Sequence, residues 1–312
     1  MKAASIAALA LLLFCAAPPC LADHLYTIQS GGKSRTYLVH TPPNASGPLP
    51  TVLLLHPYSS TASGFLGYSG LSAVADAQGF VIAAPNTAFG AFGEWNSGGE
   101  GPQNIDDVGF LRDMIDTLVT QGISDPTRIY AAGMSDGGFL VYRAGCELSD
   151  HLAAIAVVAS TETQLDYAST PPQQAYPCAI AHPVPVLHIH GLADSCVRFE
   201  GGVGSGLLRV QRQSVPDTIA HWQARDACAA ASTVTPGPDG SQCSENACAS
   251  GAAVRLCTIP AAGHIWPGAA YFPLGVNAEC GGAGSAAIDA PSAIWSFVSP
   301  YRLVNGVLGS NP

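Results

Sequence analysis

The sequence predicts an α/β fold in which a mostly parallel β-sheet is flanked by helices. Short apolar runs typical of strands alternate with helix-like runs along most of the chain, and this alternation is typical of parallel sheets joined by helical crossovers. Several strand-like runs are apolar throughout, as expected for strands buried on both faces. About 290 residues follow a predicted export signal, a length that fits one large α/β domain.

The first half of the chain contains four predicted strands, recognised by alternating or continuous apolar residues. These strands cover residues 25–30, 35–40, 51–56 and 80–84. Gly31-Gly32 between the first two favours a tight hairpin turn. Two helices are expected, at 71–78 and at 106–119, and the second shows apolar residues at helical spacing. A glycine-rich loop, 85–104, precedes the second helix.

The second half repeats the alternation of strands and helices. Its predicted strands are 128–132, 155–158, 185–190 and 254–259. Its predicted helices are 138–146, 215–224 and 290–298. Between them, residues 226–252 form a cysteine- and glycine-rich excursion. The pattern contains no internal repeat and no low-complexity linker, so residues 23–312 are expected to form a single domain.

The amino terminus is typical of a secretory signal. Lys2 provides a positive charge, residues 6–14 form an apolar core too short to span a bilayer, and Cys20-Leu21-Ala22 resembles a cleavage site. We therefore expect a signal peptide over residues 1–22 and a secreted protein, extracellular or periplasmic.

The charge pattern excludes two classes of partner. The net charge is −10, only 11% of residues are charged, and Lys33 is the single lysine after the signal. Because no basic patch is present, nucleic acid and anionic membranes are not expected to bind. No cofactor is expected, and the sequence makes no prediction of oligomeric state.

Eight cysteines follow the signal, and an even number in an exported chain indicates disulfides. Eight cysteines allow 105 pairings, so the pairing is a hypothesis. We favour Cys146–Cys178, Cys196–Cys280, Cys228–Cys257 and Cys243–Cys248. A zinc site is the alternative, but the spacing lacks paired C-x-x-C motifs with nearby histidines, so no metal is expected.

The most informative motif is Gly133-Met134-Ser135-Asp136-Gly137, which lies between a predicted strand and a predicted helix. In this context a Gly-x-Ser-x-Gly sequence is typical of a nucleophile elbow, a sharp turn that presents a strained serine. The helix that follows directs its free N–H groups and positive dipole end at the same point. A glycine-rich turn without catalytic function is the alternative.

A nucleophilic serine needs a base, and the base needs an orienting carboxylate. Asp194 follows the end of the strand 185–190, where loops of open sheets carry functional groups. His264 follows the last strand and is the only histidine after His221. The chain order Ser135, Asp194, His264 is the order expected for such an elbow. The alternatives are a solvated loop aspartate and a structural histidine.

An oxyanion hole also requires two backbone N–H groups. One is expected from Asp136, and the other from the loop after the strand 51–56. Pro57 in this loop has no N–H, so Tyr58 is the predicted donor.

Further polar and aromatic residues have two interpretations each. Trp95, Asn96 and Trp266 either line a substrate cleft or pack in the interior. His188 and His190 alternate along one strand and share a face, which favours packing at the strand end over a two-histidine metal site.

Together these residues resemble the esterase/polyhydroxybutyrate depolymerase family, which includes feruloyl esterases and acetylxylan esterases. The matching segments are 35–40, 54–56, 95–96, 106–110, 128–138, 185–191, 201–202 and 263–268. The resemblance implies an eight-stranded α/β-hydrolase fold, with Ser135, Asp194 and His264 as the catalytic residues. Two positions depart from the family pattern, because Pro57 replaces a glycine and Asp136 replaces an asparagine.

The sequence therefore predicts a secreted serine esterase whose partner is an ester substrate. Hydroxycinnamoyl (feruloyl) or acetyl esters of plant polysaccharide are the favoured substrates, and hydroxyalkanoate oligomers, as for a polyhydroxybutyrate depolymerase, are the alternative. An acyltransferase and a non-catalytic binding protein are the alternatives from other classes.

Overall fold

The computed structural model describes residues 23–43, 45–89, 93–163, 165–166, 170, 173–205, 210–269 and 280–310. The predicted signal peptide, residues 1–22, lies outside these ranges. Among the described residues, no helix combines the length and apolar character that a membrane crossing requires.

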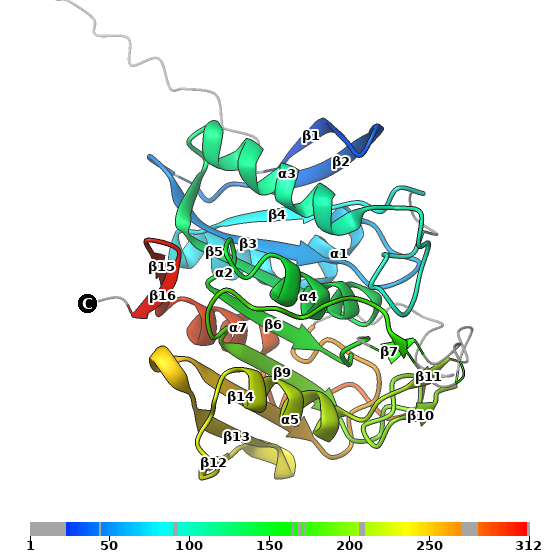
Figure 1. Cartoon of the computed structure of the whole chain (residues 1–312). Helices are drawn as coiled ribbons and strands as arrows, with labels where there is room; N and C mark the ends of the chain where they lie inside the picture. The colour runs from blue at the N-terminus through cyan, green and yellow to red at the C-terminus, as the bar shows by residue number, and fades with distance from the viewer. Residues whose placement is uncertain are drawn as a thin grey trace, which may run out of the picture.

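A ten-stranded sheet forms the centre of the molecule (Figure 1). In spatial order its strands are β1 (Asp23–Ser30), β2 (Lys33–His40), β4 (Val81–Pro85), β3 (Leu49–Leu55), β5 (Ser124–Met134), β6 (Ala154–Val158), β9 (Val186–Gly191), β14 (Ala253–Ile259), β13 (Gln242–Ala247) and β12 (Ser232–Pro236). The central strands from β4 to β14 all run parallel. The predicted mostly parallel sheet is therefore confirmed.

The predicted count of eight strands is wrong, because the excursion 226–252 extends the sheet. β13 pairs antiparallel with β14, and β12 pairs antiparallel with β13 at the edge. The segment 232–236 is rich in β-branched residues, which suit a strand, and its residues are exposed at the edge of the sheet. Its polar residues and cysteine-rich surroundings hide this strand from a search for apolar runs.

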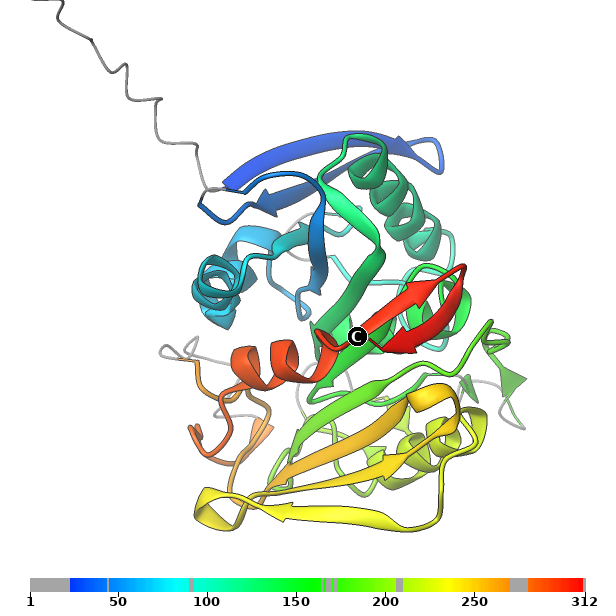
Figure 2. The same ribbon diagram turned by 90° about the vertical axis from the view of Figure 1, so that its left-hand side faces the viewer.

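Helices cover both faces of the sheet, as Figure 2 shows when the sheet is turned. One face carries α3 (Asp107–Thr120), α4 (Asp136–Glu147) and α5 (Val215–Arg225). The other face carries α1 (Ala62–Ser69), α2 (Leu71–Gln78) and α7 (Ala290–Val298). Each face has its own buried apolar cluster. The sequence did not predict α1, which begins where the Thr61 side chain accepts the N–H of Gly64.

Smaller elements lie outside the main sheet. Three two-stranded hairpins pair β7 (Leu165–Asp166) with β8 (Gln173–Gln174), β10 (Gly202–Val203) with β11 (Gln211–Arg212), and β15 (Tyr301–Val304) with β16 (Val307–Ser310). Two 3₁₀ turns, η2 (Pro238–Gly240) and η3 (Ala249–Gly251), lie in the excursion 226–252.

All eight cysteines after residue 22 form disulfides, and half of the predicted pairing is correct. Cys146–Cys178 and Cys196–Cys280 occur as expected. The other two predicted pairs are wrong, because the structure joins Cys228 to Cys248 and Cys243 to Cys257. The reason is strand register: Cys243 and Cys257 lie directly opposite each other on β13 and β14.

Candidate active site

Ser135 lies at the turn between β5 and α4, as the motif predicts. Its backbone has φ 54° and ψ −120°, a strained conformation for a residue other than glycine. The Ser135 N–H donates to the carbonyl of Val158 at 3.0 Å, and the Ser160 hydroxyl donates to the carbonyl of Ser135 at 2.9 Å. Residue Ser135 is partly exposed. The fold thus fixes the backbone of a partly exposed serine.

The glycines around Ser135 are required by close packing. A Cβ atom on Gly137 would collide with the carbonyl oxygen of Leu55 at the end of β3. A Cβ atom on Gly133 would lie 2.6 Å from the carbonyl oxygen of Gly137. The elbow is therefore pressed against the carboxyl end of the neighbouring strand, and only glycine allows this approach.

Asp194 follows β9 and is almost fully buried, with 4% of its surface exposed. Its Oδ1 accepts the N–H groups of Cys196 and Val197, both at 2.9 Å, and its Oδ2 faces the imidazole of His264 at 2.7 Å. Burial by itself would raise the pKa of Asp194. The neighbouring His264 and the hydrogen bonds to the carboxylate outweigh burial and hold the pKa below its usual 3.8.

His264 lies in the loop after β14, buried except for 5% of its surface. Since the ionised Asp194 carboxylate only accepts, His264 Nδ1 donates this hydrogen bond and the unprotonated nitrogen of the neutral ring is Nε2. The Nε2 atom is thus the nitrogen able to take up a proton. Within the described residues, no hydrogen bond joins Nε2 to the Ser135 hydroxyl.

The sheet topology brings the three predicted residues to one edge. Ser135, Asp194 and His264 follow β5, β9 and β14, which run parallel within a continuous block of the sheet. A disulfide also joins the acid loop to the chain after the base loop, since Cys196 pairs with Cys280. The Ser195 N–H strengthens this link by donating to the Cys280 carbonyl at 2.9 Å.

The two predicted oxyanion donors lie at the ends of neighbouring elements. Asp136 opens α4, where backbone N–H groups lack helical partners, and Tyr58 lies in the turn after β3. The carboxyl of Asp136 is engaged with Trp95, because its Oδ2 accepts the backbone N–H of Trp95 at 2.9 Å. Burial raises the pKa of Asp136 well above its usual range.

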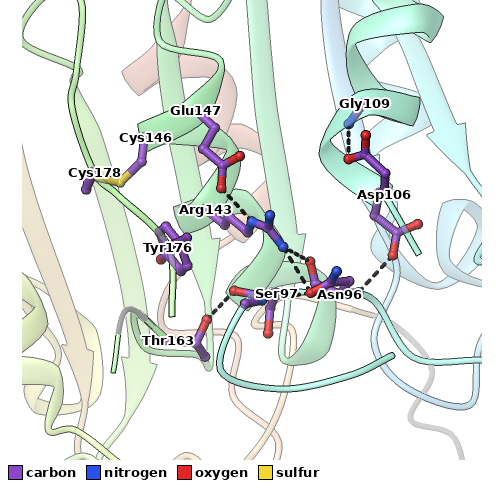
Figure 3. A network of polar contacts seen from close by, with 12 residues as sticks. Asn96, Ser97, Asp106, Gly109, Arg143, Cys146, Glu147, Thr163, Tyr176 and Cys178 are labelled. Atoms are coloured by element: carbon purple, nitrogen blue, oxygen red, sulfur yellow. Dashed lines mark hydrogen bonds and ion pairs between the residues drawn. A yellow bond between two sulfur atoms is a disulfide. The ribbon is translucent and has the colours of Figure 1, made fainter. Parts of the chain in front are cut away.

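Of the two interpretations of Trp95, Asn96 and Trp266, the structure favours packing in the interior over a substrate cleft. All three side chains are buried, with 5% or less of each exposed. The Trp266 indole donates to the carbonyl of Ser69 at 3.0 Å. The Asn96 side chain donates to the carbonyl of Ile105 and accepts from Arg143, as Figure 3 shows for the second contact.

The two histidines of β9 join a buried hydrogen-bond chain that the sequence did not reveal. His190 Nε2 donates to the carbonyl of Val197 at 2.8 Å, and its Nδ1 therefore accepts from His188 Nε2 at 3.0 Å. His188 Nδ1 in turn accepts from the Tyr142 hydroxyl at 2.6 Å. Burial lowers the pKa of both histidines, so both are neutral. The chain ends on the loop that holds Asp194.

The described residues bring one group of potential metal ligands together, Cys146, Glu162 and Cys178. Its two cysteines are joined in a disulfide, so their sulfur atoms are not thiolate ligands.

A depression of about 600 Å³ borders the acid loop. Leu192 and Val203 line it and are exposed, and Arg198 adds a positive charge. Sequence reasoning missed these residues. The only signal was the position of Leu192, two residues before the predicted acid.

No protein-family model matches the chain. Curated relatives include a putative esterase, NocK, from Nocardia uniformis, which is 30% identical over 77% of this chain and 73% of its own length. Feruloyl esterase B from Piromyces equi is 30% identical over 74% of this chain, but the match spans only 42% of that protein. Among solved structures, acetyl xylan esterase from Aspergillus awamori aligns with a TM-score of 0.59 at 12% identity, covering 77% of this chain and 94% of that one. This last likeness shows the α/β-hydrolase fold.

Proposed function

Because the chain belongs to the esterase/polyhydroxybutyrate depolymerase family of α/β hydrolases, we propose that it hydrolyses carboxylic esters with Ser135 as nucleophile. His264 acts as general base and then as general acid, and Asp194 orients the imidazole. The observation that carries this proposal is the 2.7 Å contact between His264 Nδ1 and Asp194 Oδ2. It fixes the ring tautomer that leaves Nε2 unprotonated and able to accept the serine proton.

The reaction proceeds in two halves. His264 Nε2 removes the proton of Ser135 while the serine oxygen attacks the ester carbonyl, and the N–H groups of Asp136 and Tyr58 stabilise the oxyanion. The imidazolium then protonates the departing alcohol, which leaves an acyl group on Ser135. Water, activated by the same nitrogen, releases the acid and restores the serine.

Asp194 contributes through its charge. Its low pKa keeps it ionised throughout the neutral range, and it stabilises the imidazolium that forms during each half-reaction. Among the residues that the structure describes, no hydrogen bond joins Ser135 to His264, and such contacts commonly tighten only in the substrate complex. The proposal therefore requires that the two side chains come within hydrogen-bond distance in the substrate complex.

We place the substrates among hydroxycinnamoyl or acetyl esters of plant polysaccharide. Supporting this choice, a relative named feruloyl esterase B is 30% identical over most of this chain. The exposed Leu192 and Val203 beside the acid loop offer apolar surface for an acyl or aromatic group. Hydroxyalkanoate oligomers are the alternative substrate. Secretion is part of the proposal, and the four disulfides support it because such bonds persist in oxidising compartments.

The test combines a nucleophile variant with a substrate panel. Wild-type protein, Ser135→Ala and the exposed-serine control Ser63→Ala are assayed on methyl ferulate, acetylated xylan and hydroxybutyrate oligomers. The expected result is hydrolysis of methyl ferulate or acetylated xylan by the wild type and by Ser63→Ala, and loss by a factor of about 10⁴ or more in Ser135→Ala.

Other outcomes would identify the alternatives. Hydrolysis of hydroxybutyrate oligomers alone would replace the proposed substrate class. Transfer of the acyl group to added sugar would indicate an acyltransferase. Equal turnover by wild type and Ser135→Ala would exclude Ser135 as the nucleophile.

A further inference from the structure

Trp95 is a fully buried side chain that contacts the loop carrying the predicted oxyanion donor. Its indole N–H donates to the carbonyl of His56 at 2.9 Å, and the two rings lie 5.0 Å apart. His56 is the first residue after β3 and lies two positions before Tyr58. The Trp95 indole therefore holds the start of the turn that carries the Tyr58 N–H.

The backbone of the same residue is bound to the nucleophile elbow. The Trp95 N–H donates to Asp136 Oδ2 at 2.9 Å, and Asp136 directly follows Ser135. Trp95 thus connects the start of α4 with the end of β3 through two hydrogen bonds. Both bonds are buried, where a hydrogen bond is stronger and its loss is more costly than at the surface.

The residues after Trp95 are anchored by α3, by α4 and by Thr163. The Asn96 N–H donates to the Asp107 carboxylate of α3 at 2.8 Å. Arg143 of α4 donates to both oxygens of Asn96, the carbonyl at 3.0 Å and the side chain at 2.9 Å (Figure 3). The Thr163 hydroxyl donates to the Ser97 carbonyl at 2.6 Å, also drawn in Figure 3. These hydrogen bonds therefore hold the segment that follows Trp95 in a fixed position.

Oxyanion stabilisation depends on distance. Each donor must lie about 2.7–3.1 Å from the developing oxyanion, so two donors on separate elements need a fixed separation. The elbow and the end of β3 also touch directly, because a Cβ atom on Gly137 would lie 2.7 Å from the His56 carbonyl. That same carbonyl oxygen accepts the Trp95 indole N–H.

We propose that Trp95 and the carboxyl group of Asp136 are positioning residues that hold the 56–58 loop at a fixed distance from the nucleophile elbow. The inference rests on the proposed function, in which the N–H groups of Asp136 and Tyr58 bind the oxyanion. Neither side chain touches substrate. They act by keeping the backbone N–H groups of Asp136 and Tyr58 at a fixed separation.

The experiment compares the same substitution at two buried tryptophans. Trp95→Phe removes the N–H that reaches His56. Trp222→Phe is the matched control, because Trp222 is equally buried and, among the described residues, its indole N–H has no acceptor. Both variants lose similar volume, so a difference in kcat between them reports the hydrogen bond to His56.

We expect kcat of Trp95→Phe to fall about 10- to 100-fold, less than the 100- to 1000-fold typical for loss of a donor itself. KM should change by less than about threefold, and Trp222→Phe should keep its kcat. Asp136→Leu should lose as much kcat as Trp95→Phe. Asp136→Asn should lose less kcat than Asp136→Leu, because an amide oxygen still accepts the Trp95 N–H.

Amide hydrogen exchange supplies a readout that is independent of catalysis. Exchange over residues 56–60 should accelerate in Trp95→Phe and stay unchanged in Trp222→Phe. Equal kcat losses in the two tryptophan variants, or an unchanged kcat in Trp95→Phe, would overturn the inference. If the wild type hydrolyses no ester, the proposed function fails, whereas unchanged exchange over 56–60 in Trp95→Phe refutes the positioning role itself.

Discussion

The disulfide Cys196–Cys280 is expected to support both stability and catalysis. Cys196 lies two residues after Asp194, and its N–H donates to Asp194 Oδ1 at 2.9 Å. Its partner Cys280 accepts the Ser195 N–H at 2.9 Å. The bond therefore closes the chain around the Asp194–His264 pair. Replacing both cysteines with serine frees the acid loop from the segment that follows the base loop.

The loss of stability follows from the length of chain that each disulfide closes. Cys196 and Cys280 are 84 residues apart, and the chain-entropy relation gives about 4.6 kcal/mol for a loop of this length. Cys228–Cys248 spans 20 residues, for which the same relation gives about 3.3 kcal/mol. The variant with serine at 196 and 280 should therefore be less stable than the variant with serine at 228 and 248 by about 1 kcal/mol.

Catalysis should separate the two variants more clearly. Misplacement of a catalytic group by about 1 Å costs on the order of 100-fold in rate, so the variant at Cys196 and Cys280 should lose about 10- to 100-fold in kcat. Cys228–Cys248 lies in the excursion 226–252, remote from the acid loop in sequence, and its double serine variant should keep kcat. Urea unfolding and hydrolysis of p-nitrophenyl acetate below the unfolding transition measure both effects. Unchanged kcat after removal of Cys196–Cys280 would refute the reasoning.

Three further predictions concern single residues. Burial raises the pKa of the Asp226 carboxyl from 3.8 to about 7. As pH rises, this carboxyl therefore loses its proton in the unfolded chain before it does so in the folded protein. The free energy of unfolding consequently falls between about pH 4 and 7. The free energy of unfolding of Asp226→Asn should therefore exceed that of the wild type by up to about 4 kcal/mol at pH 8 and by little at pH 4. Equal effects at both pH values in urea unfolding would contradict this. Asp194→Asn should lower kcat by about 10⁴ in ester hydrolysis, because the imidazole loses its orienting charge. In the wild type, titration of Asp194 should reduce activity only below about pH 4, since its pKa is lowered, and an activity loss assigned to Asp194 near pH 6 would exclude this. Gly137→Ala should destabilise the fold by about 3 kcal/mol in the same unfolding assay, because its Cβ meets the Leu55 carbonyl, and a wild-type midpoint would disprove the close contact.

Local patterns in the sequence predicted much of the main framework. The helix expected at 71–78 is α2 with the same bounds, and the helix expected at 290–298 is α7. The strands that form the parallel centre of the sheet were recognised because burial on both faces makes them apolar throughout. The elbow was also readable, since its glycines answer a local steric need at the turn.

Long-range features were less accessible. The pairing of Cys243 with Cys257 depends on the register between β13 and β14, and the spacing of cysteines along the chain does not contain that register. The edge strand β12 has neither a buried face nor an apolar run to mark it. For Trp95 the sequence left a substrate cleft and interior packing open, because its burial depends on elements distant in sequence.

By itself, the sequence determined the alternation of strands and helices, the chemistry of the side chains at the sheet edge, and their order along the chain. These properties are local, since they depend on residue type and on periods of two or about 3.6 residues. Only the tertiary structure decided which cysteines meet, where the Asp136 carboxyl points, and which carbonyl the Trp95 indole holds. Such choices depend on contacts between segments far apart in the chain, and these exist only after the sheet has formed.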